Sequence, residues 1–214
     1  MERVLEPEWL DSLAPYDPRA QHSRADLRRV NRLMGNARHV ARALRGARRI
    51  AEIGAGDGSF MQGVVRRLRT PGVEVTLVDR IPAAPSAGRV TAVVADAHEF
   101  LARPEPRFDA LVANLFLHHF EREPLRRLLA LAARRTRVFV ACEPRRSALA
   151  LHASRLLGLL GCNDVTRHDA LISVRAGFVD RELSALWPSE DGWMLTEGPA
   201  RPFGHLFVAR RAPL

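Results

Sequence analysis

Three glycines alternate with other residues in Glu52-Ile53-Gly54-Ala55-Gly56-Asp57-Gly58-Ser59-Phe60, where an apolar run meets an amphipathic segment. Residues 49–53 are predicted to form a buried strand and residues 60–68 a helix. Between them, glycine permits positive φ angles and a close approach of the backbone to a ligand. Because Ser59 stands where the dinucleotide fingerprint G-x-G-x-x-G has its third glycine, a pyrophosphate ligand is disfavoured. A cofactor with a nucleoside but no phosphate fits better, and Glu52 can face an ammonium group of such a molecule.

After this loop, short apolar runs alternate with helix-compatible segments, which indicates an α/β fold with a parallel sheet and crossover helices. The last two runs differ, because the connection of residues 197–202 is too short for a crossover helix and favours an antiparallel pair. A further helix is predicted over residues 147–160, ending at Gly161. The predicted strands span residues 49–53, 73–78, 89–95, 108–115, 138–141, 193–196 and 204–209.

Polar residues stand at the ends of the second, third and fourth predicted strands. Asp79 lies 21 residues after Gly58, close to the roughly 20 residues expected for an acid that binds ribose hydroxyls. Taken alone, Asp79 can equally be a solvated strand end. Asp96 and the backbone amide of Ala97 can read the amino group and ring nitrogen of an adenine, and Asn114 closes the fourth strand. Ligands of such sheets lie beyond the carboxyl ends of the strands, so these groups are expected at one site.

The motifs Glu52-x-Gly54-x-Gly56-x-Gly58, Asp79, Asp96-Ala97 and Phe108-Asp109-Ala110-Leu111-Val112-Ala113-Asn114 resemble, in this order, those of class I S-adenosylmethionine (SAM)-dependent methyltransferases. The resemblance implies a Rossmann-like sheet of seven strands, mostly parallel with an antiparallel last strand, and helices on both faces. It also implies SAM as cofactor and S-adenosylhomocysteine as product. The residues expected to contact the cofactor are Glu52, Gly54, Ala55, Gly56, Gly58, Asp79, Arg80, Asp96, Ala97, Asn114 and Leu115.

Two histidines follow the fourth strand in Leu117-His118-His119-Phe120, where the methyl acceptor is expected. Methyl transfer to oxygen is an in-line displacement that needs the hydroxyl proton removed or weakened. A neutral imidazole suits this task, because its unperturbed pKa is about 6.5. His118 is the favoured base and His119 the alternative, although either can instead cap the turn near Glu121. Acceptor contacts are predicted from His118, Tyr16 and Glu143.

The sequence around these histidines narrows the class of acceptor. Asn114-Leu115-Phe116-Leu117 lacks the Pro-Pro-aromatic run typical of enzymes that methylate base amines. In Cys142-Glu143-Pro144, the acid beside the cysteine disfavours the thiolate that cytosine-C5 chemistry needs. Together with residues 27–33 and 173–178, the histidine segment resembles bacterial methyltransferases of polyketide or quinone-type secondary metabolism. This resemblance implies O-methylation of a small phenolic or quinol acceptor.

Arginine makes up the whole of the basic excess, since 33 basic and 24 acidic residues give a charge of +9 and the chain contains no lysine. The arginines come in scattered pairs, such as Arg66-Arg67 and Arg134-Arg135, which favours solvent-facing positions over an RNA-binding face. We therefore expect no nucleic-acid partner. Two alternatives stay open: an RNA methyltransferase, and a non-catalytic module that only binds the cofactor.

The 214 residues suffice for one globular unit, with residues 1–45 as an N-terminal helical lid segment and residues 46–214 as the methyltransferase domain. Within the lid, a helix over residues 24–33 is expected to turn Leu27, Val30 and Leu33 inward. No membrane-spanning run or signal peptide is recognised, and the cysteines, Cys142 and Cys162, lack metal-ligand spacing. A cytoplasmic protein without a metal centre is expected, either monomeric or homodimeric.

Overall fold

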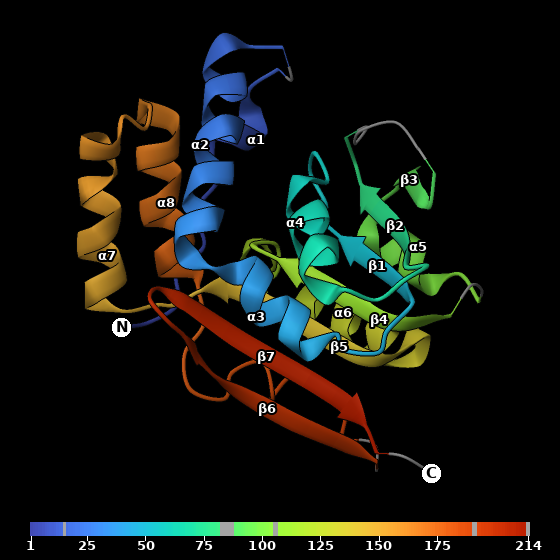
Figure 1. The fold of residues 1–214 in the computed structure, drawn as a ribbon. Helices are drawn as coiled ribbons and strands as arrows, with labels where there is room; N and C mark the ends of the chain where they lie inside the picture. The colour runs from blue at the N-terminus through green and yellow to red at the C-terminus, as the bar shows by residue number, and fades with distance from the viewer. Residues whose placement is uncertain (15, 82–87, 105–106, 190–191, 213–214) are drawn as a thin grey trace.

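The computed structural model describes residues 1–14, 16–81, 88–104, 107–189 and 192–212, and one seven-stranded sheet forms its centre (Figure 1). The strands are β1 (Arg49–Ile53), β2 (Glu74–Asp79), β3 (Val90–Val94), β4 (Phe108–Asn114), β5 (Thr136–Pro144), β6 (Trp193–Ala200) and β7 (Gly204–Arg211). The helices are α1 (Trp9–Ser12), α2 (Pro18–Met34), α3 (Asn36–Ala43), α4 (Ser59–Leu68), α5 (Ala97–Ala102), α6 (Arg122–Arg135), α7 (Ala148–Arg155) and α8 (Asp164–Ala176), with 3₁₀ turns η1 (Leu117–His119) and η2 (Leu156–Leu160).

The strand order is β3-β2-β1-β4-β5-β7-β6. Strands β1 to β5 pair in parallel, whereas β7 runs antiparallel to both β5 and β6. The chain winds outward from β1 to β3 and then returns to β4 on the other side of β1, so the loops after β1 and β4 diverge from a topological switch point. The predicted Rossmann-like sheet, mostly parallel with an antiparallel last strand, is confirmed.

Helices cover both faces of this sheet, because neighbouring residues of the central strands pack into two different cores. Ala110 and Val112 of β4 pack on one face with residues of α3 and α4, while Leu111 and Ala113 pack on the other face with residues of α5 and α6. Side chains alternate between the two faces along a strand, so this division requires an apolar layer on each side. The prediction of helices on both faces is confirmed.

The C-terminal hairpin is longer than the sequence predicts. Strand β6 continues to Ala200, so most of the predicted connection over residues 197–202 is strand, with Pro199 opposite His205. Proline is tolerated here because β6 lies at the end of the sheet, where a missing backbone N–H does not break a ladder on its free side. The further helix predicted over residues 147–160 is present as α7 followed by η2, and it ends at Gly161 in the left-handed conformation.

Helices α1, α2 and α7 gather around α8 beside the sheet (Figure 1). The prediction that Leu33 of α2 turns inward is wrong, since its side chain is 63% exposed. The buried residues of α2 include a charged one: Asp26 is fully buried and accepts from the backbone N–H of Asn163 and from the Thr166 hydroxyl. Hydrogen bonds therefore position this helix on α8. Within the described ranges, no helix combines the length and the apolar character needed to cross a membrane.

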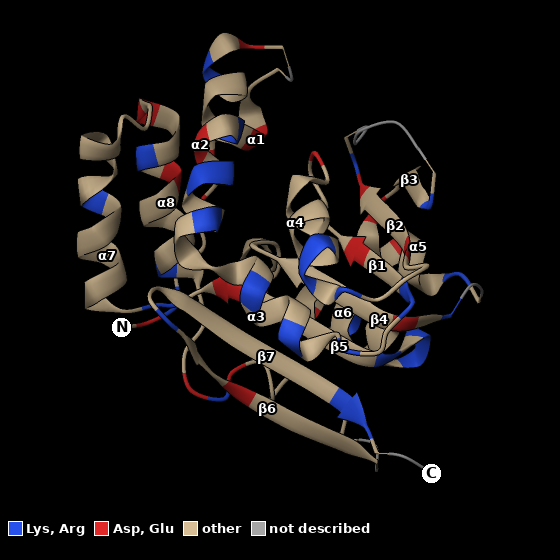
Figure 2. Cartoon of the chain, viewed as in Figure 1, with Lys and Arg blue, Asp and Glu red and all other residues tan. Residues whose placement is uncertain are grey.

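Arginines are spread over α2, α3, α7 and the end of β7 (Figure 2). Two of the paired arginines are buried and structural, which corrects the expectation of solvent-facing positions for them. Arg135 donates to the carbonyl oxygens of Phe100 and Leu101 at the end of α5, where orphan carbonyls favour a cation. Arg146 forms an ion pair with Glu182.

Candidate active site

The loop between β1 and α4 holds its three glycines in the left-handed conformation. The φ angle is +67° at Gly54, +54° at Gly56 and +72° at Gly58. A Cβ on Gly54 would lie 2.2 Å from the Phe116 ring, so this ring packs directly on the loop. A Cβ on Gly56 would meet no described atom within 4 Å, so the backbone at Gly56 is open to an approaching ligand.

Asp79, at the end of β2, is tied to this loop. Its Oδ2 accepts from the backbone N–H of Gly56 at 2.7 Å, and its Oδ1 accepts from that of Ile81 at 3.0 Å. The backbone N–H of Ala55 donates to the carbonyl of Val78 at 3.1 Å, which fixes the loop against the same strand. The structure thus brings the predicted glycine loop and the predicted ribose acid into direct contact.

Glu52 lies on β1, between β2 and β4, with 1% of its surface exposed. Its Oε2 is buried and has no hydrogen-bond partner among the described residues. Burial raises the pKa of Glu52 well above its ordinary value, and the nearby carboxylates of Asp57 and Asp79 raise it further. A buried carboxylate without a partner is costly, so the position is suited to a cationic or hydrogen-donating group from outside the chain.

Asp96 and Arg80 are brought together at the ends of β2 and β3. Asp96 caps α5 by accepting from the backbone N–H of His98 at 2.8 Å and of Glu99 at 3.3 Å. Its other oxygen accepts from the Arg80 guanidinium at 2.8 Å. Ala97, the first residue of α5, is buried. The two predicted adenine contacts therefore lie at the same sheet edge as Asp79.

Asn114 links the sheet to the N-terminal helices rather than standing free. Its Oδ1 accepts from Asn36 at 2.9 Å, and its Nδ2 donates to Asn31 at 3.2 Å. The next residue, Leu115, has a φ of +50° and donates its backbone N–H to the carbonyl of Cys142. This turn leads the chain from β4 into the histidine segment.

Glu143, at the end of β5, holds the histidine turn η1 in place. Its Oε1 accepts from the backbone N–H groups of Phe116 at 3.0 Å and Leu117 at 2.9 Å. Its Oε2 accepts from Nδ1 of His118 at 2.7 Å. Glu143 is fully buried, and its side chain contacts the imidazole of His118 and the backbone of η1 rather than a described open surface.

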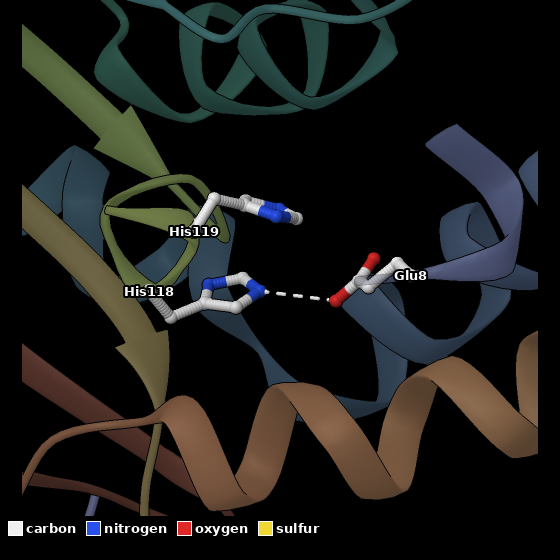
Figure 3. Close-up of side chains that lie close together, drawn as sticks. All are labelled: Glu8, His118 and His119. Atoms are coloured by element: carbon white, nitrogen blue, oxygen red, sulfur yellow. Dashed lines mark ion pairs between the residues drawn. The ribbon is translucent and has the colours of Figure 1, made fainter. Parts of the chain in front are cut away.

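Glu8 approaches the two histidines from the N-terminal segment (Figure 3). Its Oε1 lies 3.5 Å from Nε2 of His118, and the rings of His118 and His119 lie 4.2 Å apart between centroids. Burial by itself lowers the pKa of His118, but the hydrogen bonds to Glu143 and Glu8 outweigh it and raise this pKa to about 9. For His119, burial and the charge of His118 lower the pKa. Nδ1 of His119 also lies 3.8 Å from Oδ2 of Asp11.

Residues 1–12, here called the N-terminal strap, are bound to α8 and to η1. Arg3 donates to the carbonyls of Ala176 at 2.7 Å and of His118 at 3.1 Å. The backbone N–H groups of Trp9 and Leu10 donate to the Asp169 carboxylate at 2.9 and 3.0 Å. These contacts position Glu8 beside the two histidines.

The His168-Asp169 pair and Tyr16 lie outside the group formed by Glu8, His118 and His119. The His168-Asp169 pair anchors the strap, because Asp169 binds its backbone and the His168 ring stacks on Trp9 at 3.7 Å. Tyr16 is 80% exposed ahead of α2, and the structure does not bring it into the group of Glu8, His118 and His119. Glu8 was not predicted, because nothing in its local sequence distinguishes it from the neighbouring acids of the strap.

Several solved structures share this fold. Human N-acetylserotonin methyltransferase in complex with SAM superposes with a TM-score of 0.64 at 15% identity, covering 98% of this chain and 61% of its own. The plantazolicin methyltransferase BpumL, in complex with S-adenosylhomocysteine, superposes with a TM-score of 0.71 at 13% identity, and the match covers 92% of each chain. The mitomycin 7-O-methyltransferase MmcR superposes with a TM-score of 0.66 at 23% identity, and the match covers 95% of this chain and 60% of MmcR.

These likenesses show that this chain shares the Rossmann-like fold of these methyltransferases. This chain spans about three fifths of the human enzyme and of MmcR, and about nine tenths of BpumL. No protein-family model matches the sequence, and no curated protein matches it.

Proposed function

We propose that this chain is a SAM-dependent methyltransferase that transfers the methyl group to a hydroxyl oxygen of a small phenolic or quinol molecule. The observation that carries the proposal is the buried Oε2 of Glu52, which has no hydrogen-bond partner among the described residues and lies beside an open glycine loop. In this fold, both features lie at the carboxyl edge of the sheet near the switch point, where ligands bind.

The residues present fit SAM at this edge. The amino acid part of SAM carries an ammonium group, and Glu52 offers it a buried carboxylate. Asp79 can accept from both ribose hydroxyls, and Asp96 with Ala97 is placed for the adenine. Gly54, Gly56 and Gly58 keep the loop free of side chains where the methionine and ribose would lie. When bound, SAM supplies an electrophilic methyl group on its sulfonium.

His118 is the proposed base for the acceptor hydroxyl. Because Nδ1 donates to Glu143, Nε2 is the nitrogen that faces away from the core toward the strap. Glu8 occupies that side with a carboxylate oxygen, and an acceptor oxygen that displaces Glu8 would meet Nε2 in its place. Removing Glu8 takes away one of two carboxylates that favour the imidazolium, which leaves Nε2 able to accept a proton.

The position of the N-terminal strap and the histidine pair also support a lid over the acceptor and the class of the acceptor. Residues 1–45 include the strap, which crosses η1, and we assign them the role of a lid over the acceptor. The histidine pair favours an oxygen acceptor, and MmcR is named as an O-methyltransferase. A small-molecule acceptor agrees with arginines that are spread over many elements (Figure 2).

A calorimetric titration with SAM and with S-adenosylhomocysteine tests the cofactor site. We expect stoichiometric binding to the wild-type chain and at least a tenfold weaker affinity for Asp79→Asn, since an amide has one acceptor oxygen where the carboxylate has two. Asp164→Asn is the matched control, because Asp164 is exposed on α8 and pairs with Arg19. Equal affinity of Asp79→Asn and wild type would remove Asp79 from the site.

A further inference from the structure

Three potential metal ligands meet where the N-terminal strap contacts η1, with Glu8 on the strap and His118 and His119 on η1. Glu8, His118 and His119 each offer one ligand atom, and these atoms all lie within 4.8 Å of one another (Figure 3). Two imidazoles and one carboxylate are a donor set that suits Zn²⁺ and similar divalent ions. We propose that these three residues form a site for a divalent transition metal, with Zn²⁺ as the best fit.

The distances agree with this proposal. Ligand atoms that bind zinc at 2.0 to 2.2 Å in a tetrahedron lie roughly 3.4 Å apart. Nε2 of His118 lies 3.5 Å from Oε1 of Glu8, so a metal can bind both with little movement of either side chain. The His119 side chain is one third exposed, and its ligand nitrogen lies within 4.8 Å of the other two ligand atoms.

Glu143 provides the support that a metal-binding histidine needs. Metal-bound histidines usually donate their second ring nitrogen to a carboxylate, which fixes the tautomer and the ring orientation. Nδ1 of His118 donates to Glu143 at 2.7 Å, and Glu143 is itself fixed by the backbone N–H groups of η1. In the neutral imidazole with its proton on Nδ1, Nε2 carries the lone pair that a metal needs, and this nitrogen faces Glu8.

Glu8 is held in place from several sides. Its carboxylate accepts from the Ser173 hydroxyl on α8, and the backbone N–H groups of Trp9 and Leu10 bind Asp169. A ligand that is already positioned loses little conformational freedom when a metal binds. Three protein ligands leave a fourth position of the tetrahedron for water or for an oxygen of an incoming molecule. The site thus differs from the sequence-based expectation of no metal centre.

A metal here would use the same Nε2 that the proposed function assigns to proton removal. Metal binding and action as a base therefore exclude each other at His118. Binding itself does not depend on the proposed function, whereas inhibition of methyl transfer by the metal rests on it. The two can be measured separately.

Titration of the metal-free, full-length protein with Co²⁺, followed by its visible absorption, tests the site. We expect one bound Co²⁺ with the intense bands of a tetrahedral centre, displaced by Zn²⁺. His119→Gln and Glu8→Gln should each weaken binding at least about tenfold. His152→Gln is the control, because His152 is an exposed histidine on α7 that should not affect binding.

Failure to bind Co²⁺, or equal affinity of the His119→Gln and wild-type proteins, would overturn the metal site. His119→Gln is the decisive variant because its side chain is partly exposed, and circular dichroism will verify that it folds. If Zn²⁺ binds but does not slow methyl transfer, the metal site stands and the role of His118 as base is wrong.

Discussion

Replacing Glu52 by glutamine should weaken SAM binding by about a hundredfold while making the ligand-free protein more stable at neutral pH. The two effects have one cause, which is the buried carboxylate of Glu52, whose Oε2 has no hydrogen-bond partner among the described residues. Removing one member of a buried charge pair costs about 2 to 5 kcal/mol, and a hundredfold change in Kd corresponds to about 2.7 kcal/mol. In the absence of ligand, the same charge has no partner and opposes folding.

The stability effect has a defined pH dependence. Because the pKa of Glu52 is raised in the folded state, its contribution to stability is fully present below the unfolded pKa of about 4.5. That contribution is lost as the pH rises above this value toward the raised pKa of the folded protein. The free energy of unfolding of Glu52→Gln should therefore exceed that of wild type by a margin that grows with pH. Urea unfolding at several pH values measures it.

Glu74→Gln is the matched control for both measurements. Glu74 lies opposite Arg49 at the other end of the β1–β2 pair and is exposed. This variant should change neither the affinity for SAM nor the pH dependence of unfolding. A Glu52→Gln protein that binds SAM as tightly as wild type would show that Glu52 does not contact the cofactor.

Replacing His118 by glutamine should lower the turnover number by about a hundredfold or more, with the affinity for SAM nearly unchanged. General base catalysis contributes about 10² to 10⁴ in rate, and glutamine cannot accept the proton. Glu52, Asp79 and Asp96 lie at the ends of other strands than the one before His118, so their geometry should persist. Steady-state kinetics, once an acceptor is known, combined with calorimetry for SAM, separates the two effects.

His118 is buried between two carboxylates, so its replacement also leaves Glu143 without a charged partner. Rates should therefore be compared at a temperature where circular dichroism shows the variant folded. His152→Gln serves as the control for loss of a histidine elsewhere. An unaltered turnover number in folded His118→Gln would exclude His118 as the base.

The sequence was informative where local patterns determine the structure. Short-range spacing predicts the glycine loop, the acids at the strand ends and the apolar strands. In the structure, the loop and the acids lie at the same edge of the sheet. The short connection between residues 196 and 204 predicted the antiparallel end of the sheet. In the structure, β6 extends into this connection as far as Ala200.

Contacts between distant segments could not be predicted in this way. Glu8 reaches His118 only because Asp169 binds the strap and positions it over η1. Leu33 was expected to be buried by its periodicity, but α2 packs on α8 through the polar side chain of Asp26. Hydrophobic periodicity identifies apolar residues, so it cannot show that an aspartate occupies a buried position of the helix.

Incubating the purified protein with methyl-labelled SAM and a lysate of its own source tests the central proposal most directly. The label is then partitioned between solvent-extractable small molecules and RNA. We predict label in the organic extract, in a product whose methyl group is bound to an aromatic oxygen, and none with heat-inactivated protein. Label in RNA would contradict the proposed acceptor class, and absence of transfer to any fraction, with SAM bound, would contradict the proposed methyltransferase activity.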